Sequence, residues 1–162
     1  MSIFPYRSLV AALLMTGLSM AQAQTALTPE QGRAAIAPFY QALQAGQDAV
    51  GLISQATSPQ WQSCSSRDVC KPREPVMAMI AGFGKAIPDL KWDIQEVLTS
   101  GNRVIVRSEA SGTPAGAFMG VPYGGKRFQI MTIDIHTVEN GKLVRAYHVE
   151  DWMSAVRQLG AQ

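Results

Sequence analysis

Residues 87–150 read IPDLKWDIQEVLTSGNRVIVRSEASGTPAGAFMGVPYGGKRFQIMTIDIHTVENGKLVRAYHVE. Apolar and β-branched residues gather here in four short runs, which is typical of strands. The pair Asn140-Gly141 between the last two runs is a strong hairpin signal, because both positions tolerate a positive φ. The glycine- and proline-bearing segment 112–125 joins the second run to the third. The sequence therefore predicts strands at residues 92–98, 104–106, 128–138 and 143–150.

Helices are expected before and after these strands in the sequence. The segment Thr28-Pro29-Glu30-Gln31 offers an N-cap hydroxyl, a proline at the first helical position and a capping-box glutamine. Further predicted elements are a helix at residues 48–54, a polar loop at 56–71 and a helix at 72–86. Asp151 can cap a terminal helix that Gly160 closes. Helices first and an antiparallel sheet afterwards predict an α+β fold.

Three motifs also match a known family. They are Ile87-Pro88-Asp89-Leu90 at a strand entry, the crossing from Gly112 to Lys126, and the hairpin ending from Asn140 to Asp151. On these motifs the chain resembles the SnoaL-like polyketide cyclases of the nuclear-transport-factor-2-like superfamily. The resemblance implies a cone-shaped barrel, in which a curved antiparallel sheet wraps around the N-terminal helices and a short C-terminal helix follows. It also implies a homodimer built through the sheet.

The first 23 residues have the form of a signal peptide. Arg7 precedes an apolar run at residues 9–15, which is too short to span a bilayer, and Ala21-Gln22-Ala23 has the small-x-small form of a cleavage site. An uncleaved membrane anchor is the alternative. Cleavage would leave residues 24–162 as one SnoaL-like domain in the periplasm or outside the cell, with no membrane attachment.

Cysteine and charge usage narrow the remaining possibilities. Cys64 and Cys70 are the two cysteines, and an even, close pair in an exported chain predicts a disulfide. A redox pair and half of a metal site are the alternatives, although His136 and His148 are the only histidines. The formal net charge is +2, without a clustered basic stripe or a phosphate-binding loop. We therefore expect no nucleic-acid partner, no metal and no cofactor.

The two-residue turn predicts which side chains face one another. If Asn140 and Gly141 form the loop, each facing pair sums to 281, so that His136 faces Arg145, Asp134 faces Tyr147, Thr132 faces Val149 and Ile130 faces Asp151. Side chains alternate along a strand, so these eight residues would share one surface. His148 would then lie on the opposite face unless a β-bulge changes the alternation.

Two aspartates are the candidate catalytic residues. The resemblance implies a general acid/base aspartate near the end of the last strand, here Asp151, with an aromatic residue four positions earlier, here Tyr147. Asp134 is the second candidate, because a carboxylate between isoleucines is unusual. Each also has a simpler interpretation: Asp151 as a helix cap, and Asp134 as a partner of Tyr147. Further candidates for substrate contact are Thr132, His136, Trp61, Tyr123 and Met119.

Two classes of function remain open at this point. The first is an enzyme without a cofactor that moves protons on a small apolar carbonyl compound, in cyclisation, isomerisation or dehydration. The second is an exported, non-catalytic domain that binds a small molecule or assists another protein. A polar, well-ordered pocket that contains Asp151 would favour the enzyme, whereas a pocket filled by Trp61, Tyr123 or Met119 would favour binding or a structural role. The family resemblance alone does not decide between them, because this cone supports many activities.

Overall fold

The computed structural model describes residues 26–160, and the predicted signal peptide at residues 1–23 lies outside them. Within the described residues the chain forms four helices and one six-stranded sheet. The elements are α1 Pro29–Ala42, α2 Ala49–Ala56, β1 Thr57–Cys64, β2 Cys70–Pro72, α3 Arg73–Ala86, β3 Lys91–Ser100, β4 Arg103–Gly112, β5 Phe128–Glu139, β6 Lys142–Glu150 and α4 Trp152–Gly160.

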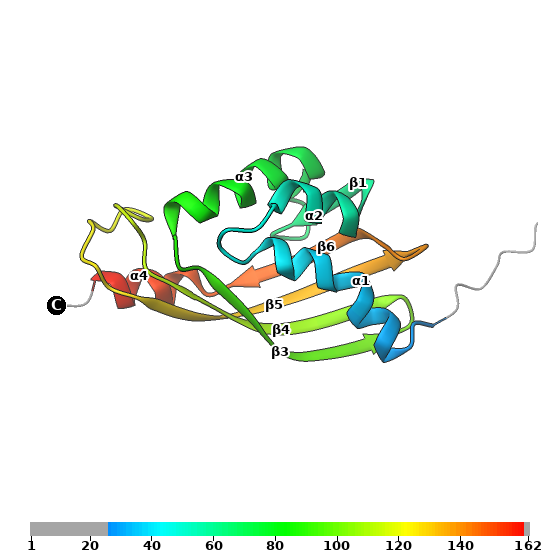
Figure 1. Cartoon of the computed structure of the whole chain (residues 1–162). Coiled ribbons are helices and arrows are strands. Elements are labelled where there is room, and N and C mark those ends of the chain that lie inside the picture. Colours follow the sequence, from blue (N-terminus) through cyan, green and yellow to red (C-terminus); the bar gives the residue numbers. More distant parts are fainter. Residues whose placement is uncertain (1–25, 161–162) are drawn as a thin grey trace, which may run out of the picture.

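The molecule has two layers, with α1, α2 and α3 over one face of a curved, open sheet and α4 at the end of β6 (Figure 1). The strand order is β2-β1-β6-β5-β4-β3. The hydrophobic core lies between the three helices and the face of the sheet that they cover. This arrangement confirms the predicted α+β class, the curved sheet against N-terminal helices and the short C-terminal helix.

The sheet has two strands that the sequence did not indicate. The sequence predicts a loop at residues 56–71, but residues 57–72 form β1, β2 and the turn between them. β1 pairs with β6 in parallel, whereas all other neighbouring strands run antiparallel. The β1 sequence TSPQWQSC is polar and carries a proline, so it lacks the apolar alternation of a typical strand. Its strand conformation depends on distant pairing partners rather than on local preference.

Helix α1 begins as its sequence predicts. The Thr28 hydroxyl accepts a hydrogen bond from the Gln31 backbone N–H, and the Gln31 side chain accepts one from the Thr28 backbone N–H. This reciprocal pair is the capping box. It fixes the start of a helix whose buried side carries Phe39 and Tyr40 over the sheet. The capping box therefore helps to place Tyr40 above the centre of β5.

The β5–β6 hairpin follows the predicted register for only the two residue pairs next to its turn. Asn140 and Gly141 both have positive φ, and Val138 faces Leu143 as predicted. Next to this pair a β-bulge intervenes, and Thr137 faces Arg145, so Val144 is an extra residue on β6. Every pair beyond it sums to 282 rather than 281. The predicted facing of Asp134 with Tyr147 is therefore wrong, and Asp134 instead faces His148.

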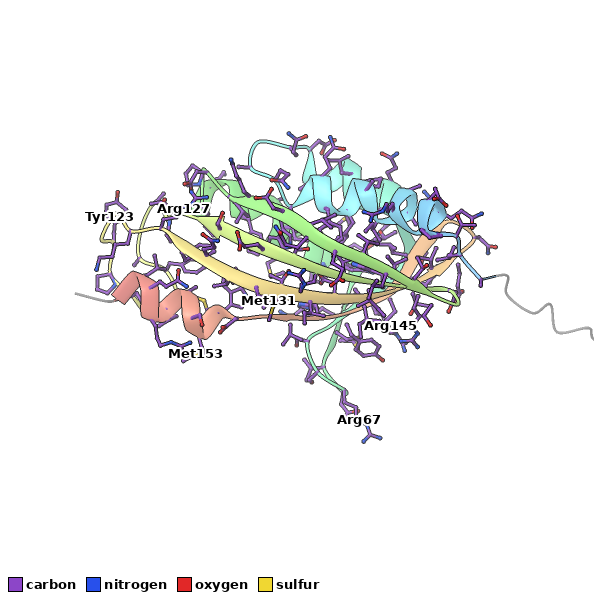
Figure 2. The ribbon with its side chains drawn as sticks, turned by 90° about the horizontal axis from the view of Figure 1, so that it is seen from below. Arg67, Tyr123, Arg127, Met131, Arg145 and Met153 are labelled. Carbon is purple, nitrogen blue, oxygen red and sulfur yellow. A yellow bond between two sulfur atoms is a disulfide. The ribbon has the colours of Figure 1, made fainter. Side chains whose placement is uncertain are left out.

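The bulge exchanges the two faces of β6. Ala146, His148 and Glu150 lie on the side of the helices, and Tyr147 and Val149 lie on the other side. On β5 the alternation is as predicted, with Thr132, Asp134 and His136 buried beneath the helices. Met131, 55% exposed, lies on the outer face of the sheet (Figure 2).

Candidate active site

A cavity of about 390 Å³ lies between the sheet and helix α3. This volume is in the usual range for small-molecule pockets. Its walls are mainly apolar and aromatic. The apolar lining comprises Phe39, Leu43, Val76, Met79, Ile80, Phe83, Trp92, Phe118, Met119, Ala146 and Trp152. The polar lining comprises Ser63, Ser65, Lys71, Asp134, His148 and Glu150. The cavity thus combines a large apolar surface with a small set of ionisable groups.

Asp134 forms part of the cavity floor and is only 5% exposed. One of its carboxylate oxygens, Oδ2, accepts a hydrogen bond from the Tyr40 hydroxyl at 2.7 Å. Burial raises the pKa of Asp134 to about 7, although the hydrogen bond from Tyr40 acts in the opposite direction. The carboxyl group can therefore hold or release a proton near neutral pH, which is what a general acid or base requires.

Tyr40 connects Asp134 to a second buried group. The Tyr40 oxygen lies 3.1 Å from Nε2 of His136, whose side chain is fully buried. When Asp134 is ionised, Tyr40 donates its single hydroxyl hydrogen to that carboxylate, so Nε2 of His136 must then carry the hydrogen in its contact with the Tyr40 oxygen. Burial lowers the pKa of His136 to about 3, so its imidazole is neutral. The same burial, with the neighbouring Asp134 charge, raises the pKa of Tyr40 well above its usual range.

His148 and Glu150 form a second acid/base pair. They are two residues apart on β6 and therefore point to the same face. Nδ1 of His148 lies 2.8 Å from Oε1 of Glu150. The hydrogen bond to Glu150 is the main reason that the pKa of His148 is raised above 6.5. A neutral His148 that donates from Nδ1 to the carboxylate keeps the lone pair on Nε2, and it can then accept a proton there.

The cross-strand register brings the two parts together. His148 on β6 directly faces Asp134 on β5, and both line the cavity. The site therefore has a buried carboxyl that retains a proton near pH 7 beside a histidine held by a glutamate. A carboxyl that can give up a proton near pH 7 and a histidine that can accept one at Nε2 can act as acid and base in one reaction.

Asp151 does not belong to this constellation, and the expectation that it lines the pocket is corrected. Its side chain is exposed, and its carboxylate accepts hydrogen bonds from the backbone N–H and the hydroxyl of Ser154. These two bonds lower its pKa below the usual range. Asp151 is thus the N-cap of α4, the simpler of its two interpretations. Facing Ile130 in the predicted register would have placed it beneath the helices, but the bulge at Val144 shifts β6 by one residue.

The other candidates for substrate contact are distributed over several environments. Met119 lines the cavity, while Trp61 is buried in the core against Phe39. Tyr123 is exposed at the end of the molecule near α4 (Figure 2). Tyr147 follows the bulge to the outer face, which corrects its predicted position beside Asp134.

Thr132 and His136 lie on the predicted face but are buried at 1% and 0% exposure, and neither is among the lining residues of the cavity. His136 therefore does not reach the cavity, and its hydrogen-bonding contact is with Tyr40. Helix α1 covers this histidine, since Phe39 and Tyr40 both contact its ring.

Sequence reasoning missed His148, Glu150 and Lys71 as site residues. A histidine and a glutamate two positions apart on a strand share a face, and that spacing was visible. The face itself was not visible, because it depends on the bulge. Lys71 was placed in a loop, whereas it lies on β2 beside the cavity.

The described part of the chain has neither a cluster of metal-binding side chains nor a membrane-spanning helix. Among residues 26–160 there is no group of three histidine, cysteine, aspartate or glutamate residues that could hold a metal ion. No helix in that range is long and apolar enough to cross a membrane. The predicted Cys64–Cys70 disulfide is present and joins β1 to β2.

Comparison with known proteins agrees with the fold. The family model for SnoaL-like polyketide cyclases matches residues 39–159. The chain belongs to this family. The fold is accordingly that of the nuclear-transport-factor-2-like cone, which confirms the resemblance in the sequence motifs. Among curated proteins the search found no relative of this chain.

Several solved structures are similar over most of the chain. TsrD from Streptomyces laurentii is 24% identical with a TM-score of 0.72, and the match covers 84% of this chain and 99% of TsrD. A SnoaL-like protein from Jannaschia sp. CCS1 is 18% identical with a TM-score of 0.72, over 84% of this chain and 97% of that protein. IdmH from Streptomyces antibioticus is 23% identical with a TM-score of 0.71, over 81% of this chain and 99% of IdmH. At these identities the likeness shows the fold.

Proposed function

We propose that this SnoaL-like domain is an acid/base enzyme that acts on a small apolar carbonyl compound in its cavity. One observation carries the proposal: the buried Asp134 carboxyl directly faces His148, which is hydrogen-bonded to Glu150, in a mainly apolar cavity of about 390 Å³. Family membership supports a small-molecule site of the cyclase type. Packing alone does not account for three ionisable groups on the floor of an apolar pocket.

The proposed reaction begins with proton removal next to a carbonyl group. Nε2 of His148 accepts the proton from the carbon, and Glu150 stabilises the resulting imidazolium. The electron pair of the broken C–H bond moves toward the carbonyl oxygen and forms an enolate. Protonated Asp134 donates its proton to that oxygen, so an enol forms and the charge of the site is conserved.

The two groups work together only in a limited pH range. Asp134 must be protonated, which favours pH below about 7, whereas His148 must be neutral, which favours pH above its raised pKa. Activity should therefore pass through a maximum near neutral pH. The enol can return the proton to a different carbon, which is isomerisation, or attack a second carbonyl group, which is cyclisation.

Proton exchange offers the most direct test. Bicyclic ketones such as 2-tetralone would be incubated with the purified protein in D₂O, and deuterium uptake followed by NMR. We expect catalysed uptake that falls roughly 100-fold or more in Asp134→Asn and in His148→Gln, because each removes one acid/base group. Asp68→Asn, an exposed carboxylate on the β1–β2 loop, is the matched control and should leave uptake unchanged. Uptake that is equal in all four proteins would contradict the proposal.

The second candidate is a non-catalytic domain that binds a small apolar ligand. The predominance of aromatic and aliphatic side chains in the cavity supports this alternative. A native mass spectrum of protein purified from the periplasm would reveal a retained ligand. Ligand retention without any proton exchange across a panel of carbonyl compounds would favour the binding domain.

Two further proposals concern location and assembly. We propose that the chain is exported and matures near Gln24, and the Cys64–Cys70 disulfide supports an oxidising compartment. We also propose a homodimer built through the outer face of the sheet. Exposed Met131, Ile133 and Val149 on that face support it, because large exposed apolar patches commonly mark interfaces.

A further inference from the structure

One cationic side chain at the cavity has no direct partner within the described part of the chain. Glu150 contacts His148, and Asp134 accepts the Tyr40 hydroxyl in a buried position. Lys71, the only lysine or arginine that lines the cavity, makes no hydrogen bond or ion pair with another described residue. The cavity thus has one ammonium group that no described side-chain carboxylate contacts.

Lys71 has a defined place at one wall. It lies on β2 directly opposite Ser63 of β1, and Ser63 in turn faces Ala146 of β6. Ser63 also lines the cavity, as does Ser65 at the end of β1. The ammonium group is close enough to His148 to oppose its protonation, which agrees with a position at this wall. Hydroxyl donors and a cation therefore occupy the β1–β2 side of the cavity.

The side of the cavity away from β1 and β2 is apolar. Phe83 of α3, Trp92 of β3 and Trp152 of α4 present apolar and aromatic surface to the cavity. A ligand that fits both sides has an apolar body with an anionic oxygen group at one end. Such a group would gain a charge-assisted hydrogen bond from Lys71, the strongest kind available at this wall.

The backbone that carries Lys71 is fixed although its side chain is exposed. Cys70, its neighbour, is bonded to Cys64 of β1, and the two strands pair from Gln62 to Cys64 with Pro72 to Cys70. Arg67 lies at the tip of the loop between these strands and points away from the sheet (Figure 2). The same hairpin therefore places one cation at the cavity and another far from it.

We infer that the cavity takes a small aromatic or alicyclic compound that bears a carboxylate-type anion, and that Lys71 binds this anion beside His148. The inference rests on the proposed function for the identity of the site, and it adds the charge and the orientation of the substrate. The anionic end lies at the β1–β2 wall, and the apolar body extends toward Trp92 and Trp152. In this orientation the carbon atoms near the anion lie next to His148.

Two probes of equal shape test the inference without any turnover. Binding of 2-naphthoate, an anion at pH 7, and of neutral 2-naphthamide would be measured by NMR titration at that pH. We expect the wild-type protein to bind naphthoate roughly tenfold more tightly than naphthamide, the size of one charge-assisted contact. Lys71→Met keeps most of the aliphatic stem but removes the charge, and should abolish the preference. Lys71→Arg should retain it.

Arg67→Met is the matched control, because it removes one positive charge from the same hairpin away from the cavity. It should leave the preference for naphthoate unchanged. Equal affinity of the two probes in the wild type, or a preference that survives Lys71→Met, would overturn the role of Lys71 while leaving the acid/base proposal intact. Failure of both probes to bind would count against the cavity as a ligand site, and so against both proposals.

Discussion

The two buried ionisable groups that contact Tyr40 should affect stability with opposite dependence on pH. The pKa of Asp134 is raised from 3.8 to about 7, so the folded protein binds this proton more tightly than the unfolded chain. Its contribution is fully present below pH 3.8 and is lost as the pH rises toward 7. The pKa of His136 is lowered from 6.5 to about 3, so its contribution is present above pH 6.5 and is lost as the pH falls. Between pH 4 and 6.5 the two effects oppose each other.

Single substitutions should separate these effects. Each unit of pKa difference corresponds to about 1.4 kcal/mol of unfolding free energy. Relative to the wild type, Asp134→Asn should therefore gain about 3 kcal/mol between pH 4 and 7, because its amide cannot lose a proton. His136→Gln should show the reverse and gain about 3 kcal/mol relative to the wild type as the pH falls from 6.5 to 4. The side-chain oxygen of the asparagine can still accept a hydrogen bond from the Tyr40 hydroxyl, so this contact can persist.

Urea unfolding followed by tryptophan fluorescence, at half-unit steps from pH 4 to 8, measures both differences. Subtracting the wild-type value at each pH removes the contribution of the exposed carboxylates. Asp68→Asn serves as the control and should give a nearly flat difference. A flat difference for Asp134→Asn would mean that Asp134 is already ionised at pH 4 in the folded protein. The general-acid role proposed for it near neutral pH would then be refuted.

Three further predictions concern parts of the molecule outside the cavity. Met131→Asp should convert a dimer into a monomer in light scattering, because it places a charge on the apolar outer face of the sheet; a wild-type monomer at tens of micromolar would contradict the dimer. Asp151→Ala should lower the melting temperature while Asp151→Asn barely changes it, since asparagine also caps helices, and loss of proton exchange in the asparagine variant would restore Asp151 as a catalytic candidate. Reduction of Cys64–Cys70 should cost about 2 kcal/mol of unfolding free energy by the loop-entropy argument, and two thiols that alkylate before reduction would contradict the disulfide.

Local signals in the sequence predicted the parts of the fold that depend on neighbouring residues. The capping box at Thr28 and Gln31 forms as expected, and so does the turn at Asn140 and Gly141. Both structures need only a few consecutive residues, because the hydrogen bonds or dihedral angles that define them are local. The burial alternation along β5 is equally local and was also predicted correctly.

Long-range pairing set the limit of the prediction. The parallel contact of β1 with β6 joins segments about 80 residues apart, and nothing in the polar β1 sequence indicates it. The bulge at Val144 lies where β6 pairs with β1 on one side and β5 on the other. β1 is distant in the sequence, and β5 lies on the other side of the hairpin turn. A shift of one residue moves every side chain of a strand to the other face. For this reason the predicted positions of Tyr147 and Asp151 are wrong, and the predicted register puts His148 on the face away from the cavity.

The same bulge places the ionisable cavity residues of β6 on the face of the sheet that carries Asp134. In the unshifted register Asp134 would face a tyrosine, and the histidine and glutamate of β6 would lie on the outer surface in water. The extra residue at Val144 brings His148 opposite Asp134 and places Glu150 on the same face. Burying these groups carries a cost, which the raised pKa of Asp134 and the unpartnered Nδ1 of His136 express. A sheet that only needed to pack against helices would avoid that cost with aliphatic residues at these positions. The polar floor is therefore better explained by the chemistry of a bound molecule than by the stability of the fold.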